Sequence, residues 1–144
     1  MNYKRLTIAT LIIFVLAQIW GFLTCGWLFN WIYEIEPTSV WLEMERMSLP
    51  LGLLWGFIFS LTFVFAYATF YAGIPGNGIK KGIRFGLLIW LVGAFPGMGS
   101  MSVYTVIAHQ VIIYWVINAL IQLIWQGAIV GRVYEPNSLA KVGE

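Results

Sequence analysis

The stretch VIIYWVINALIQLIWQGAIVGRV, residues 111–133, decides the fold class, because it is long and apolar enough for a membrane span yet carries three amides. Asn118, Gln122 and Gln126 recur every fourth residue, so on a helix they form one polar stripe. An amide without a partner in hydrocarbon costs several kcal/mol. We therefore expect the stripe to face other helices, a partner chain or a hydrated cavity rather than lipid.

The composition of the whole chain is that of a membrane protein. Of the 144 residues, 60% are hydrophobic and 10% are charged, and the mean hydropathy is +0.84, outside the usual balance of a soluble domain. The net charge of +2 is small and is divided among the loops, which argues against nucleic-acid binding. A single cysteine, Cys25, excludes an intrachain disulfide and a thiolate metal cluster built from one chain.

Four hydrophobic segments predict an all-α membrane protein, a four-transmembrane-helix bundle that forms one domain over residues 1–144. The expected parts are spans at 6–33, 49–73, 79–101 and 109–133, an outer loop at 34–48, a cytoplasmic turn at 74–78 and a cytoplasmic tail at 134–144. The first span follows two basic residues and resembles a secretion signal, but it is too long and lacks a cleavage site. We expect it to be retained as a helix.

Within the outer loop, Val40, Trp41, Met44 and Met47 recur at a spacing of three or four residues. This spacing predicts a short helix that lies at the membrane interface. A surface turn capped by a threonine or serine accounts for the same residues, so both alternatives stay open.

Glycines four residues apart occur on three of the expected helices and predict close backbone packing. Gly52 and Gly56 form one such pair, and Gly127 and Gly131 form another. The third expected helix carries the longest series of such glycines, here called the glycine ridge. Its last two members lie near the same helix face as the first three. The members of the ridge are Gly78, Gly82, Gly86, Gly93 and Gly97.

Pro96 interrupts the third hydrophobic segment. From Phe85 to Phe95 there are only 11 residues, or roughly 16 Å of helix, about half a bilayer. We therefore expect the third helix to be kinked or broken at Pro96. Residues 96–108 then form either a helix extension or a re-entrant segment.

The basic residues predict the topology. If four helices alternate, all but Arg46 of the eight Lys and Arg residues fall on one side of the membrane. That side holds Lys4, Arg5, Lys80, Lys81, Arg84, Arg132 and Lys141. We therefore expect both termini in the cytoplasm, the acidic outer loop outside, and the chain in a bacterial inner membrane.

Gln18 lies near the middle of the first span, at the depth that Gln122 has in the fourth. Equal depth predicts that Gln18 joins the interhelical polar stripe. We expect Gln18 to hydrogen-bond Gln122 or Asn118, directly or through water. Such a bond stabilises helix packing by on the order of 1 kcal/mol.

The sequence lacks the residue sets that chemistry would require. No carboxylate or basic side chain lies deep in an expected span, which argues against a proton-coupled exporter. His109 is the only histidine, and no cysteine or carboxylate lies at ligand spacing from it. It could hold a haem or metal only if copies of the chain in a symmetric oligomer each supplied a ligand. There is no Ser-His-Asp set, acid pair or phosphate loop, so we expect no enzyme, no cofactor and no metal.

The C-terminal half carries GIRFGLLIWL at 82–91, AFPG at 94–97, and residues 121–131, which end in GAIVG. In these segments the chain resembles the small bacterial four-helix membrane proteins that are grouped as a domain of unknown function. The resemblance covers the last two helices and the four-span layout. It implies the fold and supplies no catalytic residue.

Glycine ridges and amides without buried charges favour a non-catalytic membrane packing protein, either self-associating or an accessory subunit of a larger membrane complex. The same amides, with the break at Pro96, support a second hypothesis, a small channel or carrier for a neutral or weakly polar solute. The third hypothesis is a cofactor- or quinone-contacting protein, since eight Trp, seven Tyr and ten Phe could contact such a group as well as form interfacial belts. The expected partners are the lipid bilayer and other subunits or copies of the chain.

Overall fold

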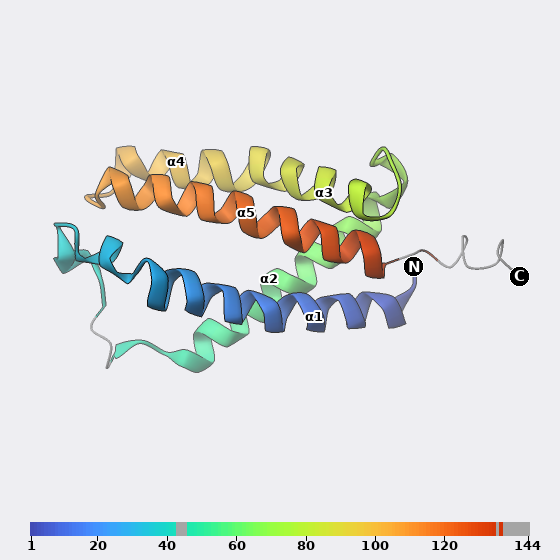
Figure 1. Cartoon of the computed structure of the whole chain (residues 1–144), viewed down its shortest axis with the longest axis horizontal. Helices are drawn as coiled ribbons and strands as arrows, with labels where there is room; N and C mark the ends of the chain where they lie inside the picture. Colours follow the sequence, from blue (N-terminus) through green and yellow to red (C-terminus); the bar gives the residue numbers. More distant parts are fainter. Residues whose placement is uncertain (43–45, 135, 137–144) are drawn as a thin grey trace, which may run out of the picture.

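A computed structural model describes residues 1–42, 46–134 and 136, and it confirms the all-helical, four-span architecture (Figure 1). Within these residues, four helices are long and apolar enough to cross a membrane, namely Tyr3–Leu28, Leu49–Gly73, Gly78–Tyr104 and His109–Val133. The α-helical parts are α1 (Tyr3–Gly21), α2 (Leu49–Phe70), α3 (Gly78–Ile89), α4 (Phe95–Tyr104) and α5 (His109–Val133). The N-terminus and the last turn of α5 lie at the same end, here called the inner end.

The first span ends earlier than the sequence predicted. After α1 the helix widens into a π-helical segment, Phe22–Leu28, in which the Phe29 N–H donates to the Thr24 carbonyl at 3.2 Å. Phe29 then leaves helical geometry, and a separate 3₁₀ helix, Asn30–Glu34, comes after it. The prediction of a continuous helix to residue 33 was therefore wrong, because hydropathy does not register a change in helix type.

Of the four positions that predicted an interfacial helix in the outer loop, Val40, Trp41 and Met47 are among the described residues, and none of these three is α-helical. The loop instead holds a 3₁₀ turn, Thr38–Val40, whose first N–H donates to a Glu36 carboxylate oxygen at 2.9 Å. Trp41 is extended, and Met44 lies outside the described residues. Over Thr38–Val40 the structure thus has a turn, whose first N–H is capped by Glu36 rather than by a threonine or serine.

The second span has the predicted bounds of 49–73, and basic side chains close the turn after it. Lys81 is only 6% exposed, and its Nζ donates to the Tyr71 carbonyl at 2.7 Å and lies 3.7 Å from the centroid of the Tyr71 ring. Arg84 donates to the Pro75 carbonyl at 2.9 Å. Gly76 has a φ of +98°, which favours glycine. These contacts hold α2 and α3 together at the inner end.

The third span continues through Pro96 and does not break there. A π-helical segment, Trp90–Ala94, precedes α4, and the Phe95 N–H donates to the Trp90 carbonyl. Pro96 lies in the first turn of α4, where its missing N–H is harmless. The irregularity therefore falls before Pro96, and the helix-extension alternative holds as far as Tyr104.

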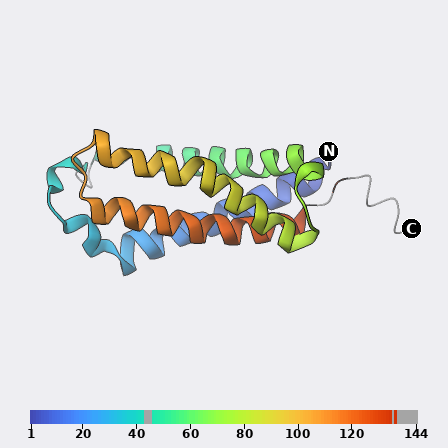
Figure 2. The same cartoon turned by 90° about the horizontal axis from the view of Figure 1, so that it is seen from above.

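Helices α3 and α5 are antiparallel and pack backbone against backbone. A Cβ at Gly82 would collide with the Gly127 carbonyl, and a Cβ at Gly86 with the Leu123 carbonyl. A Cβ at Gly131 would collide with the Gly78 carbonyl. Figure 2 shows α3 converging on the last turns of α5 at the inner end, while α4 and the start of α5 diverge. Five residues make up this glycine interface, defined as Gly78, Gly82, Gly86, Gly127 and Gly131.

Three other predicted packing glycines have no such neighbours. An ideal Cβ on Gly52, Gly93 or Gly97 meets no atom within 4 Å. For Gly93 and Gly97 the cause is the π-helical segment, which adds a residue to the turn and rotates the later residues away from the glycine ridge. Within the described chain these three glycines do not pack against another helix, and packing by them against another chain stays a prediction.

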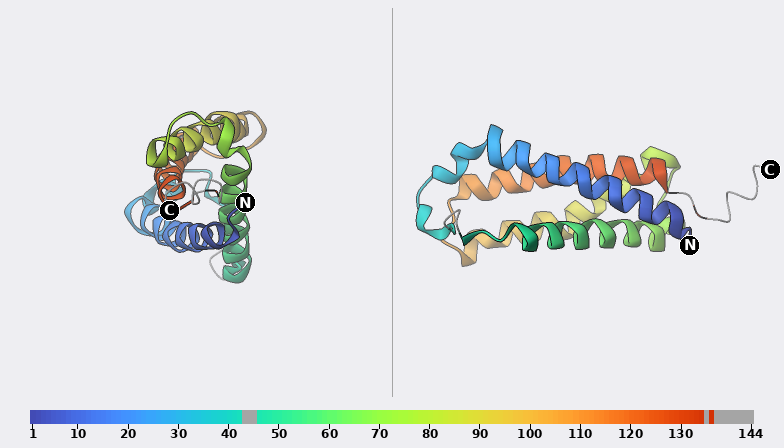
Figure 3. Two further views of the ribbon diagram at one scale, coloured as in Figure 1. Left: turned by 90° about the vertical axis from the view of Figure 1, so that its right-hand side faces the viewer. Right: turned by 90° about the horizontal axis from the view of Figure 1, so that it is seen from below.

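Helix α2 forms one side of the bundle. Seen along the bundle, α3 and α4 lie opposite α1, and α2 lies opposite α5 (Figure 3, left). The backbone of α2 packs closely only on α1 among the other spans described. At the inner end, side chains of α1, α2, α3 and α5 meet in one hydrophobic cluster. Its members are Leu6, Ala9, Ile13, Phe63, Val64, Tyr67, Ile74, Phe85, Leu123, Val130 and Tyr134.

Candidate functional site

The outer half of the interface between α1 and α5 is joined by hydrogen bonds around Asn118. The Trp20 indole Nε1 donates to Asn118 Oδ1 at 2.9 Å, and Asn118 Nδ2 donates to Thr24 Oγ1 at 3.4 Å. Thr24 is buried, and its hydroxyl donates to the Trp20 carbonyl at 2.8 Å. This member of the polar stripe therefore has partners inside the chain.

The same network includes the backbone of the π-helical segment. The Thr24 carbonyl accepts from the Tyr114 hydroxyl at 2.8 Å as well as from the Phe29 N–H at 3.2 Å. Cys25 Sγ lies 3.9 Å from the Tyr114 hydroxyl, as a partly buried thiol. Further out, Trp115 Nε1 donates to the Tyr33 hydroxyl at 3.0 Å. Cys25 is thus one member of a structural network.

A cavity of about 600 Å³ lies at the centre of the bundle, between α2 on one side and α3 to α4 on the other. Most of its lining side chains are small or apolar, and two are amides. The lining residues are Ala17, Gln18, Gly21, Gly56, Phe59, Ile89, Gly93, Ala94, Met98, Ala119, Gln122 and Leu123. Every one of the four spans contributes to this lining, so the cavity is a property of the assembled fold.

Gln18 and Gln122 share this central cavity but do not bond each other directly. Neither side chain has a hydrogen bond to another described residue, and Gln18 Nε2 lies against Gly56. The expected direct bond to Asn118 is also missing, because Trp20 takes the Asn118 oxygen. A water-mediated link between Gln18 and Gln122 stays a prediction.

Gln126, the third amide of the stripe, lies in a different environment. Its side chain is 0% exposed, and neither Oε1 nor Nε2 has a hydrogen-bond partner in the structure. The hydroxyls of Thr10 and Tyr67 are likewise buried without partners. The sequence predicted that these amides avoid lipid and did not predict that they would differ so much in environment.

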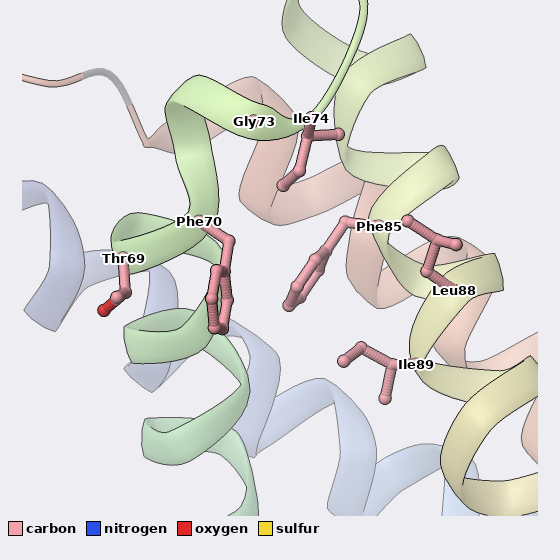
Figure 4. Close-up of a pocket in the computed structure, with 7 residues that line it drawn as sticks. All are labelled: Thr69, Phe70, Gly73, Ile74, Phe85, Leu88 and Ile89. Atoms are coloured by element: carbon pink, nitrogen blue, oxygen red, sulfur yellow. The ribbon is translucent and has the colours of Figure 1, made fainter.

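A separate apolar pocket of about 440 Å³ lies nearer the inner end, between the end of α2 and α3 (Figure 4). Figure 4 shows the rings of Phe70 and Phe85 facing this space from the two helices. Ile89 lines both the pocket and the central cavity. The only hydroxyl in the lining, that of Thr69, donates to the Phe65 carbonyl at 2.9 Å. We call this combined space between α2 and α3–α4 the seam.

A second cavity, of about 620 Å³, lies at the outer end between the π-helical segment and the outer loop. Its lining is rich in aromatic and sulfur-containing side chains and includes Cys25, Asn30, Tyr33, Trp41 and Met47. Burial raises the pKa of the Tyr33 phenol. No pattern in the sequence indicated this cavity, since it depends on how the outer loop folds over α1.

His109 begins α5 and is exposed at the mouth of a small apolar pocket that also involves Phe95 and Ile113. Across the residues that the structure describes, no group of three His, Cys, Asp or Glu side chains could hold a metal ion. The structure therefore adds no companion to His109.

Comparison of the chain with protein-family models, curated proteins and solved structures gives no match. Its resemblance to a four-helix family of unknown function accordingly stays a prediction. The functional argument depends on the seam and the polar side chains alone.

Proposed function

We propose that this chain is a non-catalytic integral membrane subunit that binds a transmembrane helix of another membrane protein in the seam. The observation that carries the proposal is that the backbone of α2 packs closely on α1, while two spaces stay open between α2 and the α3–α4 span, beside the contacts of the Phe85 ring with Phe63 and Tyr67. A bundle with such a gap exposes small residues and amides where lipid chains fill space poorly. An added helix would complete the packing.

The lining of the seam has the composition that transmembrane helix contacts favour. Gly93 lines the central cavity, and Gly52 and Gly97 lie on α2 and α4; a Cβ at any of these three would meet no atom within 4 Å, whereas Gly56, which also lines the cavity, is covered by the Gln18 side chain. Small residues allow a second backbone to approach closely, and amides such as Gln18 supply interhelical hydrogen bonds. The seam thus offers both kinds of contact to a helix from another chain.

The glycine interface, by contrast, is not available for this purpose. Gly82 and Gly127 already contact each other's backbones within the chain. The hypothesis of association, first motivated by all nine glycines, therefore now depends on those beside the seam.

Site-specific crosslinking in the native membrane tests the proposal. In a Cys25→Ser background, Gly97→Cys places a thiol one helical turn from Gly93, which lines the seam, and Val15→Cys places one on the exposed face of α1 as a matched control. We expect a thiol crosslinker to give one discrete adduct from Gly97→Cys and none from Val15→Cys. Mass spectrometry then identifies the partner as a second copy or another protein. Equal, diffuse crosslinking at both positions would contradict the proposal.

A solute carrier is the second candidate, favoured by the unbonded amides that face the central cavity. Gln18 and Gln122 could take turns as hydrogen-bond partners for a small neutral solute at mid-membrane. Flux measured in proteoliposomes distinguishes the two candidates. A carrier loses flux in Gln122→Leu, whereas a helix-binding subunit shows no flux to lose.

A further inference from the structure

Three buried polar side chains at the inner end lack partners for four of their atoms. Thr10 is 2% exposed, and Tyr67 and Gln126 are each 0% exposed. The unpartnered atoms are Thr10 Oγ1, the Tyr67 hydroxyl oxygen, Gln126 Oε1 and Gln126 Nε2. In native proteins, buried polar atoms are nearly always hydrogen-bonded to protein or to ordered water.

One of these residues belongs to the hydrophobic cluster at the inner end, and the other two are close in sequence to its members. On α1, Thr10 lies beside Ala9, and on α5, Gln126 lies one turn from Leu123 and from Val130. Tyr67 belongs to the cluster itself. Three helices thus each carry a buried polar side chain in or beside this cluster.

The register between α1 and α5 gives Thr10 and Gln126 the same depth. At the outer side Trp20 donates to Asn118, and at the inner end the Asn2 N–H donates to the Tyr134 hydroxyl at 3.4 Å. Because the helices are antiparallel, the midpoint between these two contacts lies near residue 11 on α1 and near residue 126 on α5. Thr10 and Gln126 therefore lie at about the same depth. We call Thr10, Tyr67 and Gln126 the inner polar site.

We propose that the inner polar site binds water, or an equally small neutral hydrogen-bonding molecule, as a fixed part of the fold. Gln126 offers one donor group and one acceptor, and each hydroxyl can do both, which suits a molecule that donates and accepts. A charged ligand has no counter-ion among these side chains. The surrounding cluster excludes a large ligand, because each of its members is at most 7% exposed.

The position of the site provides a route for such a molecule. Gln122 lies one helical turn outward from Gln126 and lines the central cavity, and Leu123 belongs both to that cavity and to the cluster. Small molecules in the seam therefore lie next to the inner polar site. This inference is independent of the proposed function, because a docked helix would cover the seam and leave the site in place.

Radiolytic hydroxyl-radical footprinting in nanodiscs tests for the bound molecule directly. Radicals form from water, so a fully buried Tyr67 is modified only when water lies beside it, whereas Phe63, one turn away and 4% exposed, is the matched control. We expect modification of Tyr67 and not of Phe63, and loss of the Tyr67 signal in Gln126→Leu. Protection of Tyr67 equal to that of Phe63 would overturn the proposal.

The thermal unfolding midpoint of Gln126→Leu gives a second test. It should change in opposite directions depending on whether Gln126 binds water or is buried without a partner. If the amide holds water, Gln126→Leu removes a satisfied network, and the midpoint should fall by about 3 °C. If the amide is simply buried without a partner, leucine removes its desolvation penalty, and the midpoint should rise. A rise would overturn the proposal. Should Gln126→Leu fail to fold, Tyr67→Phe, which deletes only the hydroxyl, is measured with the same two expectations.

Discussion

The two interfaces of the α3–α4 span differ in how completely they are filled. Toward α5, the backbones of Gly82 and Gly127 touch, and no side chain separates them. Toward α2, a space of about 600 Å³ contains two amides without partners in the described chain. Both sides carry glycines at intervals of four, so the motif alone does not determine whether two helices meet. What determines it is whether the facing helix offers a matching smooth surface at the same depth.

The largest effect is expected from a side chain placed in the glycine interface. Gly82→Leu forces the α3 and α5 backbones apart, because even a Cβ there collides with the Gly127 carbonyl. We expect a loss of about 3 kcal/mol or more, or no folded protein at all. Size-exclusion chromatography and thermal unfolding in detergent measure it.

Gly97→Leu is the matched control for that change, since a Cβ at Gly97 meets nothing within 4 Å. The isolated chain should then keep its unfolding midpoint. Equal destabilisation by the two variants would remove the distinction between the two interfaces.

The next effect concerns the turn that holds α2 against α3 at the inner end. Lys81→Met keeps an apolar stem but removes the bond to the Tyr71 carbonyl and the contact with the Tyr71 ring. A charge-assisted bond of this kind is worth about 1.5–3 kcal/mol, so the midpoint should fall by several degrees. Lys80→Met, at an exposed neighbouring position, should change it little. An identical response of both variants would show that the buried amine contributes no specific bond.

Asn118→Leu should have a smaller effect, localised to the outer half of the bundle. It breaks the bond from the Trp20 indole and leaves that donor unpartnered. We expect a loss of about 1 kcal/mol and a change in tryptophan fluorescence. Val116→Leu, which keeps the carbonyl that accepts from Trp90 Nε1, serves as a control on the same helix. Unchanged fluorescence in Asn118→Leu would indicate that the indole does not depend on this amide.

The regular helices agree closely with the sequence-based prediction, whereas their irregular parts do not. Hydropathy and turn signals predicted spans at 49–73 and 109–133, which the structure reproduces. Where the first span ends early, the Thr24 carbonyl accepts a hydrogen bond from the Tyr114 hydroxyl, 90 residues away. Local patterns carry no information about such a distant donor.

The candidate site was predictable in kind but not in pairing. Spacing grouped the amides on one stripe of α5, and the prediction that this stripe avoids lipid stays a prediction. The direct hydrogen bond predicted for Gln18 from its depth is not formed within the described chain. The indole of Trp20 competes for Asn118, and a π-helical segment rotates Gly93 off the glycine ridge. Both effects require knowledge of which atoms meet across helices, which a single sequence does not contain.

The smallest effect on stability is expected at Gln122, and it sharpens the contrast between the two interfaces most directly. Unlike Asn118, Gln122 has no hydrogen bond to lose within the described chain, and its side chain faces the central cavity. Gln122→Leu should therefore leave the midpoint of the isolated chain within about 1 °C, since surface-like changes without a lost contact are usually small. In the native membrane the same variant should weaken crosslinking from Gly97→Cys, because a docked helix loses an amide partner at mid-depth. A stability loss as large as that of Asn118→Leu would mean that Gln122 is bonded inside the chain, and the seam would then be a packed interface rather than a binding surface.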